Sequence, residues 1–356
     1  MHLLLVGLNH RTAPIGVREQ FAIPARDLAP ALTRLRADFG VDEAVILSTC
    51  NRVELYVTSR NPSVTFPNLV NFLSHHSRLA PEAFRACLYS VTDRGAVEHL
   101  FRVTAGLDSM VLGESEVTAQ VKQAYELAHT DGATGAVLNR LFQKALHNAK
   151  VVRSQTRIAE GQASIGSVVV KLARQLFGDR LPHCQMLLWG AGKAAEATAR
   201  HLVKHGVSQL WIVSRTPSKA QDLASLCRAG WLSWEQAMTH LSHVDIAIVC
   251  TQAPHAVIDQ ADVEALLPQR GSRPLFIIDL AVPRNVALSL KRQRGVHLYD
   301  IDDLQVIAQA TLAQRHDELA RCDALMRRQV EHFVRWHTPV RHEEVIPCGS
   351  VESSVS

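Results

Sequence analysis

Apolar and polar positions in the N-terminal part of the chain switch between two periodicities, one typical of strands and one typical of helices. Residues 44–47 are continuously apolar and predict a buried strand, whereas 53–58 alternate and predict a half-buried strand. In chain order the predicted elements are strand 3–8, helix 25–39, strands 44–47 and 53–58, helix 69–79 and strand 87–91. This β-α-β-β-α-β order is typical of a ferredoxin-like domain.

Three further helices are predicted after this pattern, at 94–106, 117–130 and 138–157. His99 lies beside the apolar stripe of the first of them, where a histidine is either a core residue or a functional one. The helix over 138–157 has a basic face opposite its buried stripe. That face carries Arg140, Lys144, His147, Lys150, Arg153 and Arg157. It is either a solvated surface or a stripe that contacts RNA phosphates, and the pattern leaves both open.

Apolar strands alternate with helices in the second half of the chain, which predicts a doubly wound parallel sheet. The predicted strands are 186–189, 209–213, 245–250, 275–280 and 296–299. The first of these strands runs into a GxGxxA turn that opens a helix, and amides at such a helix start can hold a pyrophosphate. The turn consists of Gly190, Ala191, Gly192, Lys193, Ala194 and Ala195.

The strand after that turn ends in Ser214, Arg215 and Thr216. An NAD site usually has an acidic residue at this point to bind the ribose hydroxyls, whereas an arginine suits the 2′-phosphate of NADP. The sequence therefore predicts a Rossmann-type domain that binds NADPH.

Residues 302–336 follow a helical pattern with few breaks, and a single helix of that length would be about 50 Å long. A helix this long usually packs against another body, often a partner subunit. The last stretch, rich in Pro, Gly and Ser, is expected to be disordered. The predicted parts of the chain are a first domain 1–158, a nucleotide domain 159–301 with a hinge near 162–167, a spinal helix 302–337, and a tail 338–356.

The composition is that of an ordinary globular protein, with 47% hydrophobic and 20% charged residues. We find no apolar run long enough to span a bilayer. The seven cysteines include no CxxC pair, so neither a disulfide framework nor a zinc site is indicated. We therefore expect the protein to be located in the reducing cytoplasm. A net charge of +4 does not by itself argue for nucleic-acid binding.

Candidate chemistry centres on Cys50, which lies between the predicted strands 44–47 and 53–58. Loops between rigid strands often carry functional side chains. Arg52, two residues on, can hold a carboxylate and lower the pKa of a thiol. A small buried hydrophobe at the end of a strand is equally compatible with this position, so spacing alone does not decide between the two interpretations.

Several stretches, in this order, make the sequence similar to the glutamyl-tRNA reductase family over nearly all of residues 1–336. They are GLNHRTAP (7–14), STCNRVELY (48–56), GLDSMVLGE (106–114), QVKQAY (120–125), GAG (190–192), SRT (214–216) and DLAVPR (279–284). The resemblance implies a ferredoxin-like catalytic domain, a Rossmann-type NADP-binding domain and a long spinal helix that joins them.

The resemblance also implies an activity: the reduction of glutamyl-tRNA(Glu) to glutamate-1-semialdehyde by NADPH, the first step of tetrapyrrole (5-aminolevulinate) biosynthesis. The Cys50 thiolate would attack the ester that links glutamate to tRNA, and a hydride would reduce the resulting thioester. Arg52 would bind the free side-chain carboxylate, Glu114 the α-ammonium, and His99 would protonate or position the leaving group. Further substrate contacts implied by the resemblance are Thr49, Asn51, Ser109, Ser115, Glu116 and Gln120.

Two departures from the family bear on substrate and assembly. The family commonly has Pro-Gln after Glu114, and we expect the added carboxylate of Glu116 to weaken the grip on an anionic substrate. Alternatives are a diverged paralogue that reduces another aminoacyl ester or thioester, and a non-catalytic tRNA-binding regulator. The family continues into a helical dimerisation domain, whereas about twenty residues follow Trp336 here, so we expect the implied homodimer to be weakened. The downstream glutamate-1-semialdehyde aminomutase is a further candidate partner.

Overall fold

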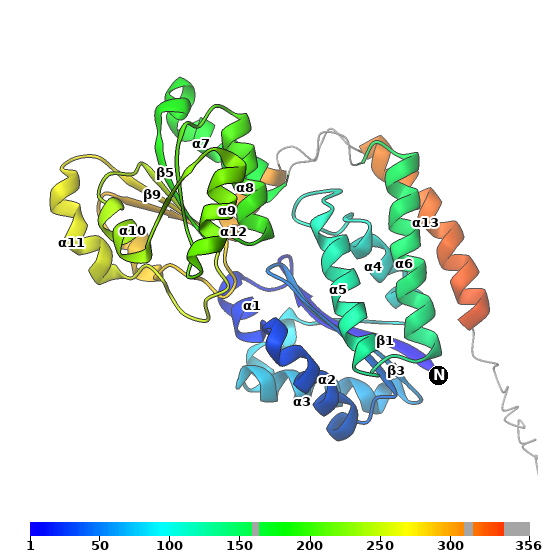
Figure 1. The fold of residues 1–356 in the computed structure, drawn as a ribbon. Helices are drawn as coiled ribbons and strands as arrows, with labels where there is room; N and C mark the ends of the chain where they lie inside the picture. The colour runs from blue at the N-terminus through cyan, green and yellow to red at the C-terminus, as the bar shows by residue number, and fades with distance from the viewer. Residues whose placement is uncertain (159–163, 310–315, 338–356) are drawn as a thin grey trace, which may run out of the picture.

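The computed structural model describes residues 1–158, 164–309 and 316–337, which form two α/β bodies side by side and a long helix (Figure 1). The N-terminal body is built on an antiparallel sheet and the second body on a parallel one. Within these ranges we find no helix long and apolar enough to cross a membrane. The expected tail at 338–356 and part of the expected hinge at 162–167 lie outside the described residues.

The N-terminal sheet has four strands in the order β2-β3-β1-β4, and neighbouring strands are antiparallel. The strands are β1 His2–Asn9, β2 Glu43–Ser48, β3 Arg52–Ser59 and β4 Tyr89–Thr92. The strand that we expected at 53–58 is present as β3, but it is buried along its whole length, so the expected half-burial is wrong. The physical reason is that helices cover both faces of this sheet, which leaves the polar side chains of β3 no solvent to face.

One face of the sheet is covered by α1, α2 and α3 and the other by α4, α5 and α6 (Figure 1). These helices are α1 Ile15–Phe21, α2 Leu28–Phe39, α3 Pro62–Ser77, α4 Asp93–Thr104, α5 Glu116–Thr130 and α6 Ala136–Gln155. α3 begins earlier than the helix predicted at 69–79. The Asn61 side chain accepts a hydrogen bond from the Ser63 N–H at 3.2 Å, and Pro62 fits the first turn.

The second body contains a parallel sheet in the order β10-β9-β8-β5-β6-β7, which confirms the predicted α/β fold with a parallel sheet. Its strands are β5 Gln185–Trp189, β6 Gln209–Val213, β7 Gly230–Leu232, β8 Ile246–Val249, β9 Leu275–Asp279 and β10 Val296–Tyr299. Its helices are α7 Ile165–Phe177, α8 Lys193–Lys204, α9 Pro217–Cys227, α10 Trp234–His240, α11 Gln260–Arg270 and α12 Ile301–Gln309. The strand order reverses between β5 and β8, and ligands of open α/β sheets bind at the carboxyl ends of the strands at such a reversal.

Short 3-10 helices lie between the main elements. They span Ala25–Asp27, Pro81–Ala83, Arg85–Cys87, Gly178–His183 and Leu288–Arg292. Two of them occur where the sequence pattern predicts no helix of its own, directly before β4, and they carry the chain from α3 back to the edge of the first sheet.

The segment predicted as a spinal helix contains α12 and a second described helix, α13 His316–His337. α12 packs on α7 of the second body, whereas α13 packs along α4 and α6 of the first (Figure 1). The α13 side chains buried in the core of the first body are Cys322, Met326, Val330 and Phe333. Residues 310–315 lie outside the described part, so one continuous helix over 302–337 stays a prediction. The apolar face of α13 is covered by its own chain.

The basic face of α6 is partly used within the chain. The Arg140 guanidinium lies 4.1 Å from the centroid of the Trp336 ring, a cation–π contact that helps to hold α13. The Arg153 Nη2 donates to the main-chain carbonyl of Glu114 at 2.7 Å and to the Thr118 hydroxyl at 2.6 Å. These arginines therefore have a structural role, and the use of this face as an RNA-binding stripe stays a prediction.

Two ion pairs join α1 of the first body to the second body. Arg18 is 2% exposed, and its Nη2 donates to Asp302 Oδ1 at 2.8 Å, while the Ile15 N–H donates to Asp302 Oδ2 at 3.0 Å. Glu19 accepts from Arg284 Nε at 3.0 Å and from its Nη2 at 2.5 Å. Adjacent residues of α1 thus bind the segment after β9 and the start of α12, and they fix how the bodies meet.

We expect the double variant Glu19→Gln, Asp302→Asn to loosen this contact, because each change removes the charge from one interdomain ion pair. The radius of gyration measured by small-angle X-ray scattering should rise above that of the wild type. Glu196→Gln, which removes the charge from the Glu196–Arg200 pair within α8, is the control and should leave the radius unchanged. A double variant as compact as the wild type would show that these pairs do not hold the bodies together.

Candidate active site

Cys50 lies in the turn that joins β2 to β3, and hydrogen bonds from its neighbours shape this turn. The Thr49 N–H donates to the carbonyl of Arg52 at 2.9 Å, which closes the turn. The Thr49 hydroxyl accepts from the N–H groups of Asn51 at 3.2 Å and Arg52 at 3.1 Å. The His10 N–H donates to the Asn51 carbonyl at 2.9 Å and ties the turn to the end of β1. Thr49 and Asn51, both predicted substrate contacts, therefore set the position of Cys50.

The Cys50 side chain is half-buried at the boundary between the two bodies, where it packs against an apolar cluster that includes Ile15, Met110 and Val111 of the first body and core residues of the second. Burial and the nearby carboxylates of Glu116 and Glu114 raise the pKa of its thiol to about 12. The thiol is therefore protonated at neutral pH in this arrangement. Its position at the boundary also means that the core of its own domain does not enclose it.

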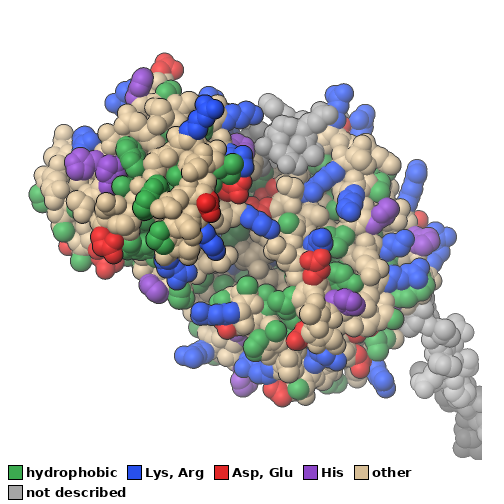
Figure 2. All heavy atoms as spheres, in the orientation of Figure 1, with side chains coloured by type: hydrophobic (Ala, Val, Ile, Leu, Met, Phe, Trp, Pro, Cys, Tyr) green, Lys and Arg blue, Asp and Glu red, His purple; other side chains and the backbone are tan. Residues whose placement is uncertain are grey.

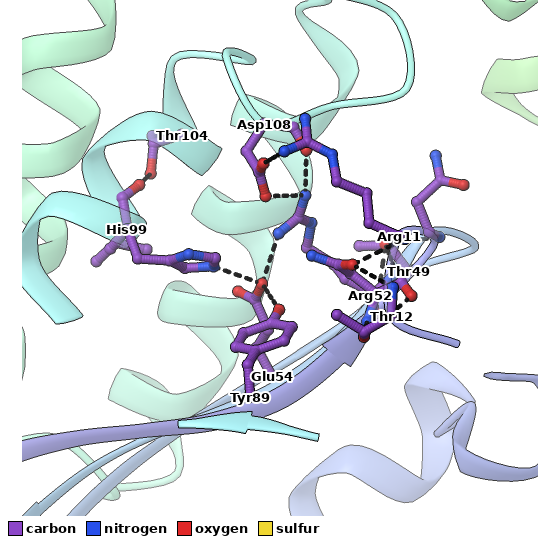
Figure 3. A network of polar contacts seen from close by, with 12 residues as sticks. Arg11, Thr12, Thr49, Arg52, Glu54, Tyr89, His99, Thr104 and Asp108 are labelled. Atoms are coloured by element: carbon purple, nitrogen blue, oxygen red, sulfur yellow. Dashed lines mark hydrogen bonds and ion pairs between the residues drawn. The ribbon is translucent and has the colours of Figure 1, made fainter. Parts of the chain in front are cut away.

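A buried carboxylate, Glu54 on β3, lies at the centre of a polar network (Figure 3). Its Oε1 accepts from Arg52 Nη1 at 2.5 Å and from the Tyr89 hydroxyl at 2.5 Å, and the Tyr56 hydroxyl donates to Oε2 at 2.6 Å. The His99 Nε2 lies 2.8 Å from Oε1. Burial alone would raise the pKa of Glu54, but Arg52 and His99 outweigh it and hold the pKa well below its usual range. Because an ionised carboxylate only accepts, His99 Nε2 carries the hydrogen of this bond.

Arg52, the predicted ligand of the substrate carboxylate, is fully buried between two carboxylates of its own chain (Figure 3). Its Nη2 donates to the main-chain carbonyl of Asp108 and, at 3.0 Å, to Oδ2 of the same residue. The other oxygen of Asp108, Oδ1, lies 2.8 Å from Nη1 of Arg11. The structure therefore places a chain of alternating charges from Arg11 through Asp108 and Arg52 to Glu54.

A pair of carboxylates lies between the Cys50 turn and the second body. Burial and the charge of Glu116 raise the pKa of Glu114 to about 7. The buried hydroxyl of Ser109 has no hydrogen-bond partner among the described residues. Burial also raises the pKa of Glu116, against the attraction of Lys193 in the glycine-rich turn. Ser115 is exposed at the N-cap position of α5. Figure 2 shows the surface hollowed where the two bodies meet, with acidic and basic side chains around the hollow.

The GxGxxA turn after β5 fits a dinucleotide. Gly190 has a φ of +120°, and a Cβ there would lie 2.4 Å from the Cys250 carbonyl oxygen, so the position requires glycine. At Gly192 no described atom lies within 4 Å of where a Cβ would be, which leaves space in front of the N-terminus of α8. Lys193 is exposed beside this space. The open helix start is the kind of site that binds a pyrophosphate.

Arg215 is exposed just beyond the carboxyl end of β6. The neighbouring Ser214 hydroxyl accepts from the Thr216 N–H at 3.3 Å, which shapes the turn. β6 pairs with β5 in parallel, so Arg215 lies at the same sheet edge as the GxGxxA turn. This placement suits contact with the ribose end of a dinucleotide.

The remaining predicted site residues are Gln120 and the three alanines of the GxGxxA turn. Gln120 is half-buried on α5, one helical turn after Glu116. Ala191 and Ala194 are half-buried, and Ala195 packs in the core of the second body. Within the described ranges we find no cluster of three or more side chains able to hold a metal ion.

Five residues of the network are not among those that the sequence singles out as site residues. They are Arg11, Glu54, Tyr56, Tyr89 and Asp108. Arg52 and Glu54 stand two residues apart on one strand, which puts opposite charges on the same face and is a signal for an ion pair. No local pattern indicates Asp108, because a loop brings it to Arg52 from 56 positions away along the chain.

Known proteins resemble both bodies. Residues 6–156 match the family model described as "Glutamyl-tRNAGlu reductase, N-terminal domain". Residues 171–307 match the model described as "Shikimate / quinate 5-dehydrogenase", which supports a nicotinamide-cofactor-binding domain of the dehydrogenase type. Among solved structures, "Glutamyl-tRNA Reductase from Methanopyrus kandleri" is 32% identical, covers 94% of this chain and 80% of that one, and superposes with a TM-score of 0.49.

Curated relatives that match most of the chain are also glutamyl-tRNA reductases. The glutamyl-tRNA reductase of Moorella thermoacetica is 39% identical over 336 residues, which are 94% of this chain and 76% of that protein. The glutamyl-tRNA reductase of Oleidesulfovibrio alaskensis is 40% identical over 336 residues, which are 94% of this chain and 74% of that protein. With identity at this level over most of both sequences, the chain belongs to the glutamyl-tRNA reductase family, a family of oxidoreductases.

Proposed function

We propose that this protein is an NADPH-dependent glutamyl-tRNA reductase, which forms glutamate-1-semialdehyde from glutamyl-tRNA(Glu) in the cytoplasm at the start of tetrapyrrole biosynthesis. The observation that carries the proposal is the position of Cys50, at the boundary between the bodies and against an apolar cluster to which both contribute side chains. Family membership supports the choice of substrate. In this proposal residues 1–158 are a ferredoxin-like catalytic domain and residues 159–301 the NADP-binding domain.

The first half of the reaction is acyl transfer to Cys50. The sulfur forms a bond to the ester carbonyl carbon, and the bond from that carbon to the ribose oxygen of the tRNA breaks. The leaving oxygen must gain a proton, and the thiol must lose one. Glu54 engages His99 at Nε2. In this proposal the other ring nitrogen, Nδ1, would accept the thiol proton and return it to the leaving oxygen.

The second half is reduction of the thioester on Cys50. NADPH, when bound, would supply the hydride for the thioester carbonyl carbon, and the carbon–sulfur bond would break to give the aldehyde and the Cys50 thiolate. Gly190 and Gly192, at the N-terminus of α8, would hold the pyrophosphate. Arg215 would bind the 2′-phosphate that distinguishes NADP from NAD.

A direct test uses intact-mass spectrometry of the purified protein mixed with glutamyl-tRNA(Glu) while NADPH is withheld. We expect a glutamyl adduct on Cys50, because the thioester cannot be reduced without the hydride donor. Adding NADPH should remove the adduct and release glutamate-1-semialdehyde. Cys50→Ser is the control and should form neither thioester nor aldehyde. Wild-type protein that shows no adduct and no aldehyde would refute the proposed function.

Glu116→Gln should lower the pKa of the Cys50 thiol, because it removes a negative charge that disfavours the thiolate. More thiolate is then present at any pH below the thiol pKa, so alkylation by iodoacetamide at about pH 9 should be several-fold faster. Peptide mapping assigns the label to Cys50. Glu126→Gln, on the exposed part of α5, is the matched control. Alkylation no faster than in the wild type would mean that Glu116 does not act on the thiol.

Arg215→Ala should reduce the preference for NADPH over NADH, because the 2′-phosphate loses its guanidinium partner. The ratio of kcat/KM values for the two cofactors should fall by about tenfold. Arg200→Ala, which removes an exposed arginine from α8, should leave the ratio unchanged. A ratio unaffected by Arg215→Ala would assign cofactor choice to another residue.

A further inference from the structure

The guanidinium of Arg52 has no spare positive charge in this structure. Glu54 binds its Nη1 at 2.5 Å and Asp108 binds its Nη2 at 3.0 Å, so two carboxylates already face one cation. With Arg11 beside Asp108, two arginines face two carboxylates, so a third carboxylate, from a substrate, would meet a site whose charge is balanced. Coulomb attraction at a buried site is strong in both directions, so an added anion there is repelled unless another one leaves. Any anion that binds Arg52 must therefore displace one of the two.

The two carboxylates differ in how firmly they are held. The side chain of Glu54 is fully buried, and Tyr56, Tyr89 and His99 bind it in addition to Arg52. Moving the Glu54 carboxylate away would leave several buried donors without an acceptor. Glu54 is therefore a permanent partner of Arg52.

The Asp108 carboxylate is held more weakly, and a second cation, Arg11, lies within its reach. Its side chain is 12% exposed, and its Oδ1 already lies 2.8 Å from Nη1 of Arg11, whose side chain is 57% exposed. The main-chain carbonyl of Asp108 also accepts from Arg52 Nη2, so the loop stays anchored if only the carboxylate turns away. Figure 3 shows Asp108 between the two arginines.

We propose that Asp108 is a place-holder, which occupies Arg52 in the free enzyme and passes to Arg11 when the side-chain carboxylate of the glutamyl group arrives. This inference rests on the proposed function. It adds Asp108 as a residue that determines specificity and Arg11 as the residue that binds the displaced carboxylate. The exchange keeps the number of charges on Arg52 constant, so it requires an incoming anion. A neutral side chain of the same length cannot drive it.

The proposal predicts opposite effects of two single variants on the KM for glutamyl-tRNA(Glu). Asp108→Asn removes the competing charge and should lower KM by about two- to fivefold. Arg11→Gln removes the receiving partner, keeps Asp108 on Arg52, and should raise KM by about two- to fivefold. In the double variant the Arg11 change should have no further effect, because there is no displaced carboxylate to receive. Turnover is followed as semialdehyde formed with saturating NADPH.

Arg94→Gln is the control, because it removes an exposed arginine from α4 without touching the network. A raised KM in Asp108→Asn at an unchanged melting temperature would overturn the proposal, since it would show that Asp108 supports substrate binding. An Arg11→Gln effect that persists in the double variant would also overturn it, because Arg11 would then act on the tRNA directly.

Poor folding of Asp108→Asn would not end the test. Arg11 lies on the surface, and an Arg11→Gln variant with unchanged KM contradicts the exchange without any second change. Failure of the proposed function looks different, because wild-type protein would then form no adduct on Cys50. An active wild type whose variants shift KM in other directions refutes only the exchange.

Discussion

The buried ion pair between Arg52 and Glu54 is the interaction on which the first body depends. Taking two charges out of water costs roughly several kcal/mol per ion, and mutual attraction alone seldom offsets that cost. Here additional partners supply the difference: Tyr89 brings β4 to Glu54, and His99 brings α4 to the same oxygen. Asp108 brings in the loop after α4. The pair thereby holds together, around one point, elements that carry most of the candidate site.

β1, the strand that pairs with β3, leaves space for the Arg52–Glu54 ion pair. Gly7 of β1 stands in register with Glu54 of β3, and a Cβ at Gly7 would lie 2.8 Å from the Glu54 Cγ and 2.8 Å from the Val53 carbonyl oxygen. Glycine in the middle of a strand normally weakens it. In this sheet the missing side chain is what allows a carboxylate to lie flat beside the central strand, so local strand stability is traded for the polar network.

Much of the fold can be predicted from the sequence because apolar spacing reports burial directly. The parallel strands and the GxGxxA turn are local patterns, as is the position of Cys50 between two strands. β3 was misjudged because its polar residues look like a solvent face. The polar residue Glu54 is instead bound by Tyr89 and His99, which lie 35 and 45 positions away along the chain. α1 also cannot be predicted from the spacing of apolar residues, because it is short and because one of its buried residues is Arg18. The partner of Arg18 is Asp302, far along the chain.

The arrangement of the two bodies suits one half of the proposed reaction better than the other. A thiol with a pKa of about 12, beside Glu114 and Glu116 and against apolar side chains, is poorly prepared to become an anion. A thioester at the same sulfur carries no charge, so the same surroundings do not oppose it. The docked arrangement therefore disfavours the thiolate that attacks the tRNA ester more than it disfavours the acylated sulfur.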